Sequence, residues 1–426
     1  MIMQIINNKG RILKYAIIIF FLNRLLTLEF LNYYPVMGEI YVLVSEILTV
    51  WYCFKFFYVH SRKNHLYVNE VGVVLLIAIY FTYAFFNTLF HDGSVRRVIM
   101  TAYPIIGSLC FIEVESRNHY DELIRGFNFF LVFFVIVNFW DMIFIRHALT
   151  GLMTTTFMVG GKNQLAILLS VALAFYCVIC QEQERKQFFN LKSIAYLFVI
   201  TMSAVLSTSS TCMITIMAVI LLYILMVVKK KELLVNPTGV MIIYVVSWFA
   251  LIVFRIHYLF ADLLRNWFHK DLTLSHRTII WDRALELIVK KPVFGYGLSE
   301  SLNVFSVHHD YTGGNNNVWT ALSGHNQFLQ LLYYGGIVLM MMFFAIYFVS
   351  TKKKRRNNYH FKYYFLGVIG ILINWMSEVP SEYAMFLMLG ICYFSERSLW
   401  RSVENESELQ INQYYRARIQ GREISR

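Results

Sequence analysis

Two stretches of the chain carry residues suited to an anionic substrate. RTIIWDRALELIVKKP begins at Arg277, and SGHNQF begins at Ser323. Arginine suits phosphate groups because its planar guanidinium presents paired donors at the matching spacing. Arg277 lies four residues before Trp281, so a helix would place both side chains on one side. The alternative interpretation is that Arg277 only extends from the helix start toward the membrane surface.

The second stretch places a histidine near a predicted helix start. Ser323 is expected to cap the helix, with His325 and Asn326 in its first turn. The positive field of a helix N-terminus attracts phosphate and disfavours protonated imidazole. A neutral His325 could therefore act as a base or as a hydrogen-bond donor. The alternative is an interfacial histidine without chemistry.

Further charged residues could join these two. Lys162, Arg255 and Arg283 are candidates for binding the same anion, together with Trp281 and Asn326. The competing interpretation is that the loop bases pair with loop acids such as Asp282 and Glu286. Glu378 and Glu382 flank Pro380 and could supply a carboxylate, although a surface role is favoured for both.

Metal and cofactor chemistry is not expected from the sequence. His308, His309 and Asp310 are contiguous, so their side chains diverge and do not favour a metal site. The six cysteines all lie inside apolar blocks and indicate neither a disulfide framework nor a zinc site. We therefore predict no cofactor and no bound metal.

The elements that position these residues are membrane helices. Of the 426 residues, 58% are hydrophobic, 15% are charged and only 5 are prolines. A soluble domain is rarely so apolar, because its surface needs polar cover. Backbone groups in lipid must be satisfied within their own segment, which favours helices. The sequence predicts an all-α polytopic membrane protein with about twelve spans and one large extracytoplasmic loop containing amphipathic helices.

The spans can be placed from the apolar blocks. At about 20 residues each, they fall near 12–31, 36–59, 68–90, 95–114, 123–145, 163–181, 193–208, 210–228, 238–259, 326–350, 361–377 and 382–396. Residues 1–259 would then hold nine spans, 260–325 the extracytoplasmic loop, 326–397 three spans and 398–426 a cytoplasmic tail.

The basic residues give the expected orientation. The net charge of +12 lies largely in short runs between apolar blocks, which argues against a nucleic-acid surface. Most lysines and arginines face the cytoplasm if both termini lie there, as the positive-inside rule requires. The loop would then lie outside, with LFADLLRNWF along the interface and a second helix from 276 to 291. Ile280, Trp281, Ala284 and Ile288 would form that helix's apolar face, opposite Asp282, Arg283 and Glu286.

Four stretches follow one another between residues 160 and 337: GGKNQLA at 160–166, LSTSST at 206–211, RTIIWDRALELIVKKPVFGYG at 277–297 and GHNQFLQLLYYGGI at 324–337. In their order and spacing the chain resembles the Wzy-type polysaccharide polymerases and O-antigen ligases of bacterial cytoplasmic membranes. Members often carry an arginine in the segment matched by LSTSST, where this chain has Ser209, Ser210 and Thr211. Arg255 or Arg283 would have to take over that contact.

The resemblance implies a metal-independent, inverting glycosyltransferase of the bacterial cytoplasmic membrane. It would join undecaprenyl-diphosphate-linked oligosaccharide repeat units into capsular, exo- or O-antigen polysaccharide at the outer face. Arg277, with Arg283 or Lys162, would hold the diphosphate. His325 would activate the acceptor hydroxyl or bind the departing diphosphate. Membrane lipid, a flippase and a chain-length regulator are further candidate partners.

Two other functions stay open at this stage. A ligase would pass finished glycan to a different acceptor, and the motifs do not separate it from a polymerase. A transporter or flippase of the lipid-linked unit is a third candidate. Transporters usually have related halves and polar residues near the bilayer midplane. Here the halves differ and the candidate residues gather toward the outer face.

Overall fold

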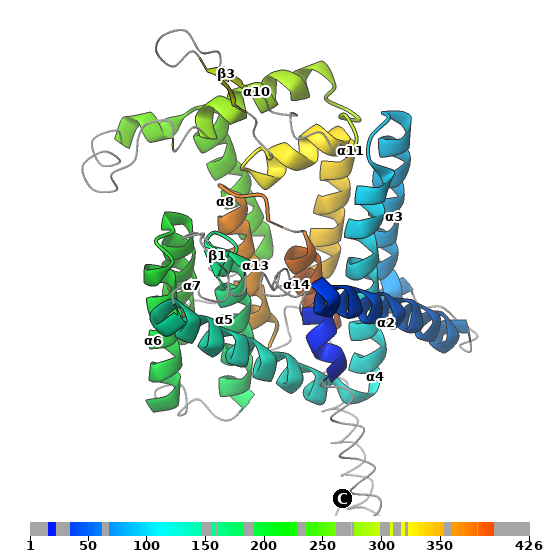
Figure 1. The fold of residues 1–426 in the computed structure, drawn as a ribbon, viewed down its shortest axis with the longest axis vertical. Helices are drawn as coiled ribbons and strands as arrows, with labels where there is room; N and C mark the ends of the chain where they lie inside the picture. The colour runs from blue at the N-terminus through cyan, green and yellow to red at the C-terminus, as the bar shows by residue number, and fades with distance from the viewer. Residues whose placement is uncertain are drawn as a thin grey trace, which may run out of the picture.

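The chain forms a bundle of apolar helices in the computed structural model (Figure 1). The structure describes residues 16–22, 35–61, 68–145, 156–157, 160–182, 191–228, 236–260, 274, 277–298, 307–309, 317–319, 323–352, 360–380 and 382–395. The interfacial segment expected at 259–268 lies mostly outside these residues, as do Ser275 and the tail after 397.

The described helices follow the predicted spans and, in α10, the second helix expected in the loop. They are α2 (Pro35–Ser61), α3 (Val68–Phe90), α4 (Val95–Trp140), α5 (Leu165–Glu182), α6 (Leu191–Leu206), α7 (Ser210–Val228), α8 (Pro237–Trp248), α10 (Arg277–Lys290), α11 (Gln327–Ser350), α13 (Phe361–Trp375) and α14 (Tyr383–Phe394). Residues 16–22 are also helical. Two short antiparallel hairpins join β1 (Thr156–Phe157) to β2 (Gly160–Gly161) and β3 (Val307–His309) to β4 (Asn317–Trp319).

Length and apolarity make five of the described helical stretches able to cross a membrane: Val36–Ser61, Gly72–Phe90, Val95–Arg117, His119–Phe144 and Gln327–Ser350. Six shorter apolar helices accompany them, in the regions of α5, α6, α7, α8, α13 and α14. A multi-pass membrane protein is therefore supported. The number of about twelve spans stays a prediction.

Two boundaries differ from those predicted. The expected spans 95–114 and 123–145 are joined in α4, which is interrupted only at His119 (φ −140°, ψ 39°). No proline or glycine occurs between Glu115 and Glu122 to end the helix. The span expected to reach 259 ends earlier, because α8 passes into a π-helix (Phe249–Val253) and Arg255 adopts a positive φ of 53°.

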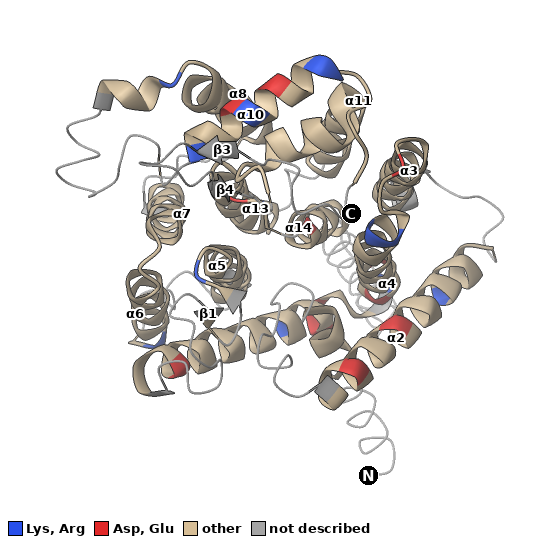
Figure 2. Ribbon diagram, turned by 45° about the horizontal axis from the view of Figure 1, so that its top comes forward, with Lys and Arg blue, Asp and Glu red and all other residues tan. Residues whose placement is uncertain are grey.

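The centre of the bundle is formed by α13 and α14 (Figure 1). Every residue of α14 is buried, and all but Lys362 and Ile373 are buried in α13. Helices that are apolar on all sides need such a position. By contrast, α2 leaves large side chains such as Phe54 (70% exposed) on the outside. Charged residues gather on α10, whereas α5, α7 and α13 carry few of them (Figure 2).

The GYG and GG motifs contact each other and fix the end of α10. Gly336 interrupts α11 with a φ of 62°, and Gly295 has a φ of 67°. A Cβ on Gly336 would lie 2.2 Å from the Val293 carbonyl oxygen, so only glycine fits this approach. The Tyr296 amide donates to the Tyr333 carbonyl at 2.9 Å and the Gly297 amide to the Tyr334 carbonyl at 2.8 Å. These bonds tie the segment after α10 to the break in α11.

Candidate functional site

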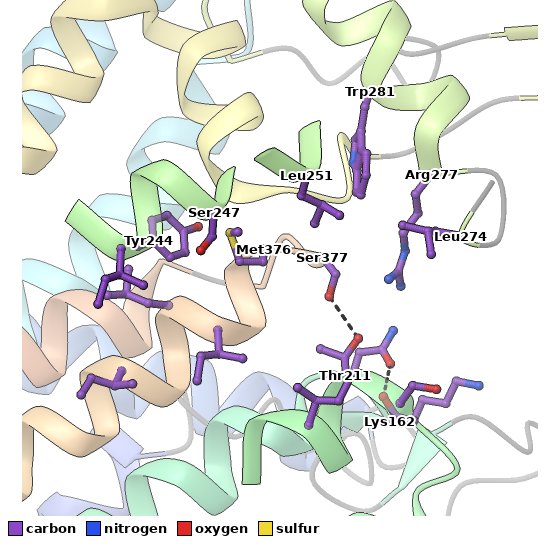
Figure 3. Close-up of a pocket in the computed structure, with 18 of the residues that line it drawn as sticks. Lys162, Thr211, Tyr244, Ser247, Leu251, Leu274, Arg277, Trp281, Met376 and Ser377 are labelled. Carbon is purple, nitrogen blue, oxygen red and sulfur yellow. Dashed lines mark hydrogen bonds between the residues drawn. The ribbon is translucent and has the colours of Figure 1, made fainter. Parts of the chain in front are cut away.

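A large cavity lies beneath the N-terminal end of α10 (Figure 3). Its volume is about 830 Å³. Apolar side chains of α7, α8 and α13 form most of its wall: Ile214, Leu222, Val240, Ile243, Tyr244, Ile369, Leu372 and Ile373. Polar side chains gather at the other end: Lys162, Asn163, Thr208, Ser209, Ser210, Thr211, Arg277 and Ser377. The cavity therefore suits an amphiphilic ligand with a long apolar part and a polar head.

Arg277 is the first residue of α10 and lines this cavity. The apolar face predicted for the helix is confirmed, since Ile280, Trp281, Ala284 and Ile288 are buried. Burial of this face orients Arg277 so that its guanidinium points into the hollow (Figure 3). The guanidinium also donates to the Glu378 carboxylate, in the turn between α13 and α14. Arg277 therefore faces the cavity while it is held by a carboxylate distant in sequence.

His325 lies at the same carboxylate. Its Nδ1 is 3.8 Å from Glu378 Oε2, and the histidine side chain is 37% exposed. The helix start differs from the prediction: Asn326, not Ser323, caps α11, because its side chain accepts from the Leu329 amide. His325 therefore precedes the helix, with a φ of 43°, instead of lying in the first turn. This backbone bend directs the histidine toward Glu378.

Glu378 is buried, which corrects the surface role expected for it. Asn163 Nδ2 donates to Glu378 Oε1 at 2.8 Å, and Ser209 Oγ donates to Asn163 Oδ1 at 2.7 Å. Asn374 Nδ2 donates to the Asn163 carbonyl at 2.9 Å. A buried carboxylate requires such partners. The chain of contacts connects the GGKN segment, the Ser/Thr segment and the turn after α13 at one point.

Lys162 is the second cation at the polar end of the cavity. Within the described ranges no ion pair joins it to a carboxylate. Ser209, Ser210 and Thr211 lie at the same end, and Thr211 Oγ1 is 3.0 Å from Ser377 Oγ. The Ser/Thr segment thus reaches the cavity with hydroxyl groups. Lys162, contributed by a different segment, provides the additional positive charge.

Arg255 lies behind Trp281 instead of among the cavity's lining residues. Its guanidinium is 5.4 Å from the Trp281 ring centroid, donates to the Thr278 carbonyl at 3.1 Å and pairs with Asp282. Trp281 is fully buried and lines the cavity. Arg255 therefore supports the wall that Trp281 forms.

Arg283 lies on the exposed face of α10, outside the membrane-spanning helices. It pairs with Glu286 at 2.6 Å, and Lys290 pairs with the same carboxylate at 2.7 Å. These hydrogen bonds from Lys290 and Arg283 lower the pKa of the Glu286 carboxyl. Arg283 is not among the residues that line the cavity. For Arg255, Arg283 and Lys290, pairing between loop bases and loop acids is confirmed.

Asn326 is not brought to the cavity either. It is fully buried, accepts from Trp248 Nε1 at 2.9 Å and donates to the Met376 carbonyl at 2.9 Å. These bonds connect the start of α11 to α8 and to the end of α13. Asn326 therefore has a structural role, which is to hold the start of α11 next to His325.

Sequence reasoning missed Asn163 and undervalued Glu378. A lone asparagine in GGKN and a glutamate beside Pro380 carry no recognisable spacing. One signal was available: both are polar residues at the predicted outer ends of spans. A polar or ionisable side chain beside the membrane usually faces a partner or a cavity.

The site can hold a lipid-borne anion and act on a neighbouring hydroxyl. Two cations, Arg277 and Lys162, lie at the polar end of an apolar cavity. The Glu378 carboxylate pairs with the arginine, and the His325 imidazole lies beside that carboxylate, although neither is among the residues that line the cavity. Cations can stabilise a phosphate leaving group, and a carboxylate or imidazole can accept a proton.

The apolar helices define the chain as an integral membrane protein of the multi-pass kind. Residues 195–344 match the family model of the O-antigen ligases. This match confirms the resemblance to the superfamily of O-antigen polymerases and ligases. It includes Arg277, Trp281 and His325, whereas Lys162 and Glu378 lie outside the matched segment. No curated protein matches the sequence.

Proposed function

We propose that this chain is a polysaccharide polymerase that joins oligosaccharide repeat units carried on undecaprenyl diphosphate. The observation that carries the proposal is the cavity itself. Its apolar walls end at Arg277 and Lys162, a buried glutamate pairs with the arginine, and a histidine lies beside that glutamate. A polyprenyl diphosphate has the matching order of groups, with an apolar chain, a diphosphate and then a sugar.

The polyprenyl chain would lie along α7, α8 and α13. Ile214 of α7 and Ile243 of α8 line the cavity and are 53% and 67% exposed. We place the opening of the cavity toward the lipid between these two helices. The carrier could then enter sideways from the bilayer without leaving its apolar environment.

The transfer breaks the bond between the anomeric carbon of the donor sugar and the diphosphate oxygen. The electron pair of that bond stays on the diphosphate, where Arg277 and Lys162 stabilise the developing charge. The acceptor hydroxyl forms the new bond to the anomeric carbon from the opposite side, which inverts the configuration. Its proton passes to Glu378 or His325. The chain's own residues supply every role in this step.

The second candidate is a ligase that transfers glycan from the same carrier to a different acceptor. The family description of the matched segment, O-antigen ligase, favours it. Both functions use the same donor and the same leaving group. They differ in the acceptor alone.

Deleting the gene for this chain in the bacterium that encodes it distinguishes the polymerase from the ligase. A polymerase deletion leaves single repeat units on the lipid carrier at the outer leaflet. A ligase deletion leaves long glycans on that carrier, and accumulation facing the cytoplasm would contradict both functions.

Rescue with variants tests the site in the same strain. We expect Arg277→Ala and His325→Ala each to abolish chain extension while the protein still inserts at wild-type levels. Lys290→Ala, on the exposed face of α10, is the matched control and should restore full extension. Wild-type glycan ladders from either site variant would remove that residue from the mechanism.

A further inference from the structure

A second, smaller pocket lies on the other side of the GGKN segment. It has a volume of about 400 Å³, at the lower end of the range of about 300–1,000 Å³ usual for small-molecule sites. Its lining residues are Gly161, Lys162, Asn163, Gln164, Asn374, Glu378, Val379 and Pro380. Lys162 and Asn163 belong to both hollows, so they form the wall between them.

The two hollows differ in charge and in polarity. Among the described residues, the charged side chains that line the large cavity are Lys162 and Arg277, both cations. In the small pocket they are Lys162 and Glu378, one of each sign. The small pocket also holds three side-chain amides, from Asn163, Gln164 and Asn374, beside the apolar Val379 and Pro380. Amides and paired charges suit neutral hydroxyl groups, whereas two cations suit a diphosphate.

Glu378 connects the two hollows. Its Oε1 accepts from Arg277 of the large cavity and from Asn163 of the shared wall, and its Oε2 faces His325. A hydroxyl bound in the small pocket would meet this carboxylate on the side opposite the diphosphate. Asn374 is fully buried there, and within the described residues its Oδ1 has no hydrogen-bond partner.

We propose that the small pocket binds the non-reducing terminal sugar of the acceptor glycan, and that Gly161, Gln164 and Asn374 determine which sugar fits. This inference rests on the proposed function, because it assigns the acceptor to one named half of the same site. The diphosphate of the donor occupies the large cavity. The acceptor hydroxyl reaches Glu378 from the small pocket.

Gly161 allows a direct test by filling the pocket. A Cβ at Gly161 meets nothing within 4 Å, so a side chain added there enters open space. Gly161→Trp should fill the pocket, and Gly161→Ala is the matched control. Both variants are compared with the full-length wild-type chain in phospholipid vesicles. Donor units come from the deletion strain, and mild acid releases the free repeat-unit oligosaccharide from a portion of them.

Three measurements are made on each protein: undecaprenyl diphosphate affinity, binding of the free oligosaccharide by saturation-transfer NMR, and the glycan ladder. Gly161→Trp should no longer bind the oligosaccharide, and its extension rate should fall at least tenfold. Its affinity for undecaprenyl diphosphate should stay within twofold of wild type. Gly161→Ala should match wild type in all three. Extension by Gly161→Trp within twofold of wild type would overturn the proposal, as would an equal loss of diphosphate affinity.

Gln164→Ala keeps the test decisive if the tryptophan variant does not fold. Gln164 is exposed and lines only the small pocket, so its removal should weaken oligosaccharide binding several-fold without changing diphosphate affinity. Unchanged oligosaccharide binding would contradict the proposal that the small pocket binds the acceptor sugar. Failure of the wild-type chain to form any ladder or to release undecaprenyl diphosphate would instead reject the proposed polymerase function.

Discussion

Two clusters in this molecule contain the same three residue types, a buried glutamate with an arginine and a histidine. In the first, Glu378 pairs with Arg277 and faces His325. In the second, Glu113 pairs with Arg117, whose guanidinium is 2.8 Å from His60 Nε2. Both glutamates are buried.

The clusters differ in what they connect and in what they face. Glu113 and Arg117 are four residues apart on one helix, and none of the second cluster's residues lines the cavity or the small pocket. Arg277 and Glu378 come from separate segments of the chain, and each lines a hollow. The comparison teaches that residue types alone do not define a site. We expect the adjoining space for a ligand to separate a catalytic cluster from a structural one.

The largest contrast is expected between the two glutamates. Glu378→Gln should lower the extension rate by about a hundredfold or more, the usual contribution of a general base. Glu113→Gln should keep the rate of the folded protein within about twofold. It should lower the thermal unfolding midpoint instead, because it removes the buried negative charge that pairs with Arg117. Rates per folded molecule and unfolding curves in detergent give both readouts. Equal losses of rate in the two variants would break the comparison.

The next effect concerns Lys162. Lys162→Met should raise the KM for the lipid-linked donor by about tenfold, since a charge-assisted hydrogen bond contributes about 1.5–3 kcal/mol. Lys290→Met removes an equal charge from the exposed face of α10 and should change KM by less than twofold. Initial rates across donor concentrations measure both. A similar shift in both variants would show that Lys162 acts only through overall surface charge.

Asn163 is expected to act as a positioning residue. Asn163→Ala removes the amide that donates to Glu378 and should lower kcat by about fivefold to tenfold. Undecaprenyl diphosphate affinity should stay within twofold, because Arg277 and Lys162 remain. A merely structural role would weaken affinity and kcat together, so the split between the two quantities is the critical result.

The smallest effect is expected at Arg283. Its partner is Glu286, and it does not line the cavity. Arg283→Gln should change kcat/KM by less than twofold. A loss of tenfold or more would return Arg283 to the diphosphate site and remove the distinction drawn between the two faces of α10.

The sequence predicts elements well where local pattern decides them. The apolar face of α10, its end near Pro292 and the glycine turn that follows are all visible in the order of residues, because helix periodicity and glycine conformation are local properties. Arg277 and His325 were identified from their chemistry and from the expected helix starts.

The rest of the site depends on contacts between distant segments. Glu378 lies 101 residues after Arg277 and 215 after Asn163, and no local spacing signals either contact. The sequence indicates that bases and acids of this region can pair, but not which arginine pairs with which acid, since Arg255 and Arg283 carry the same charge as Arg277. Their partners, Asp282 and Glu286, decide which arginine remains at the cavity.

The central claim is that Arg277 and the polar end of the cavity hold the diphosphate of a polyprenyl carrier. The most direct test is the affinity of purified Arg277→Gln and Arg117→Gln for undecaprenyl diphosphate, measured by native mass spectrometry beside wild type. We expect the dissociation constant to rise at least about tenfold for Arg277→Gln and to stay within twofold for Arg117→Gln. Unchanged affinity in a folded Arg277→Gln protein would contradict the claim.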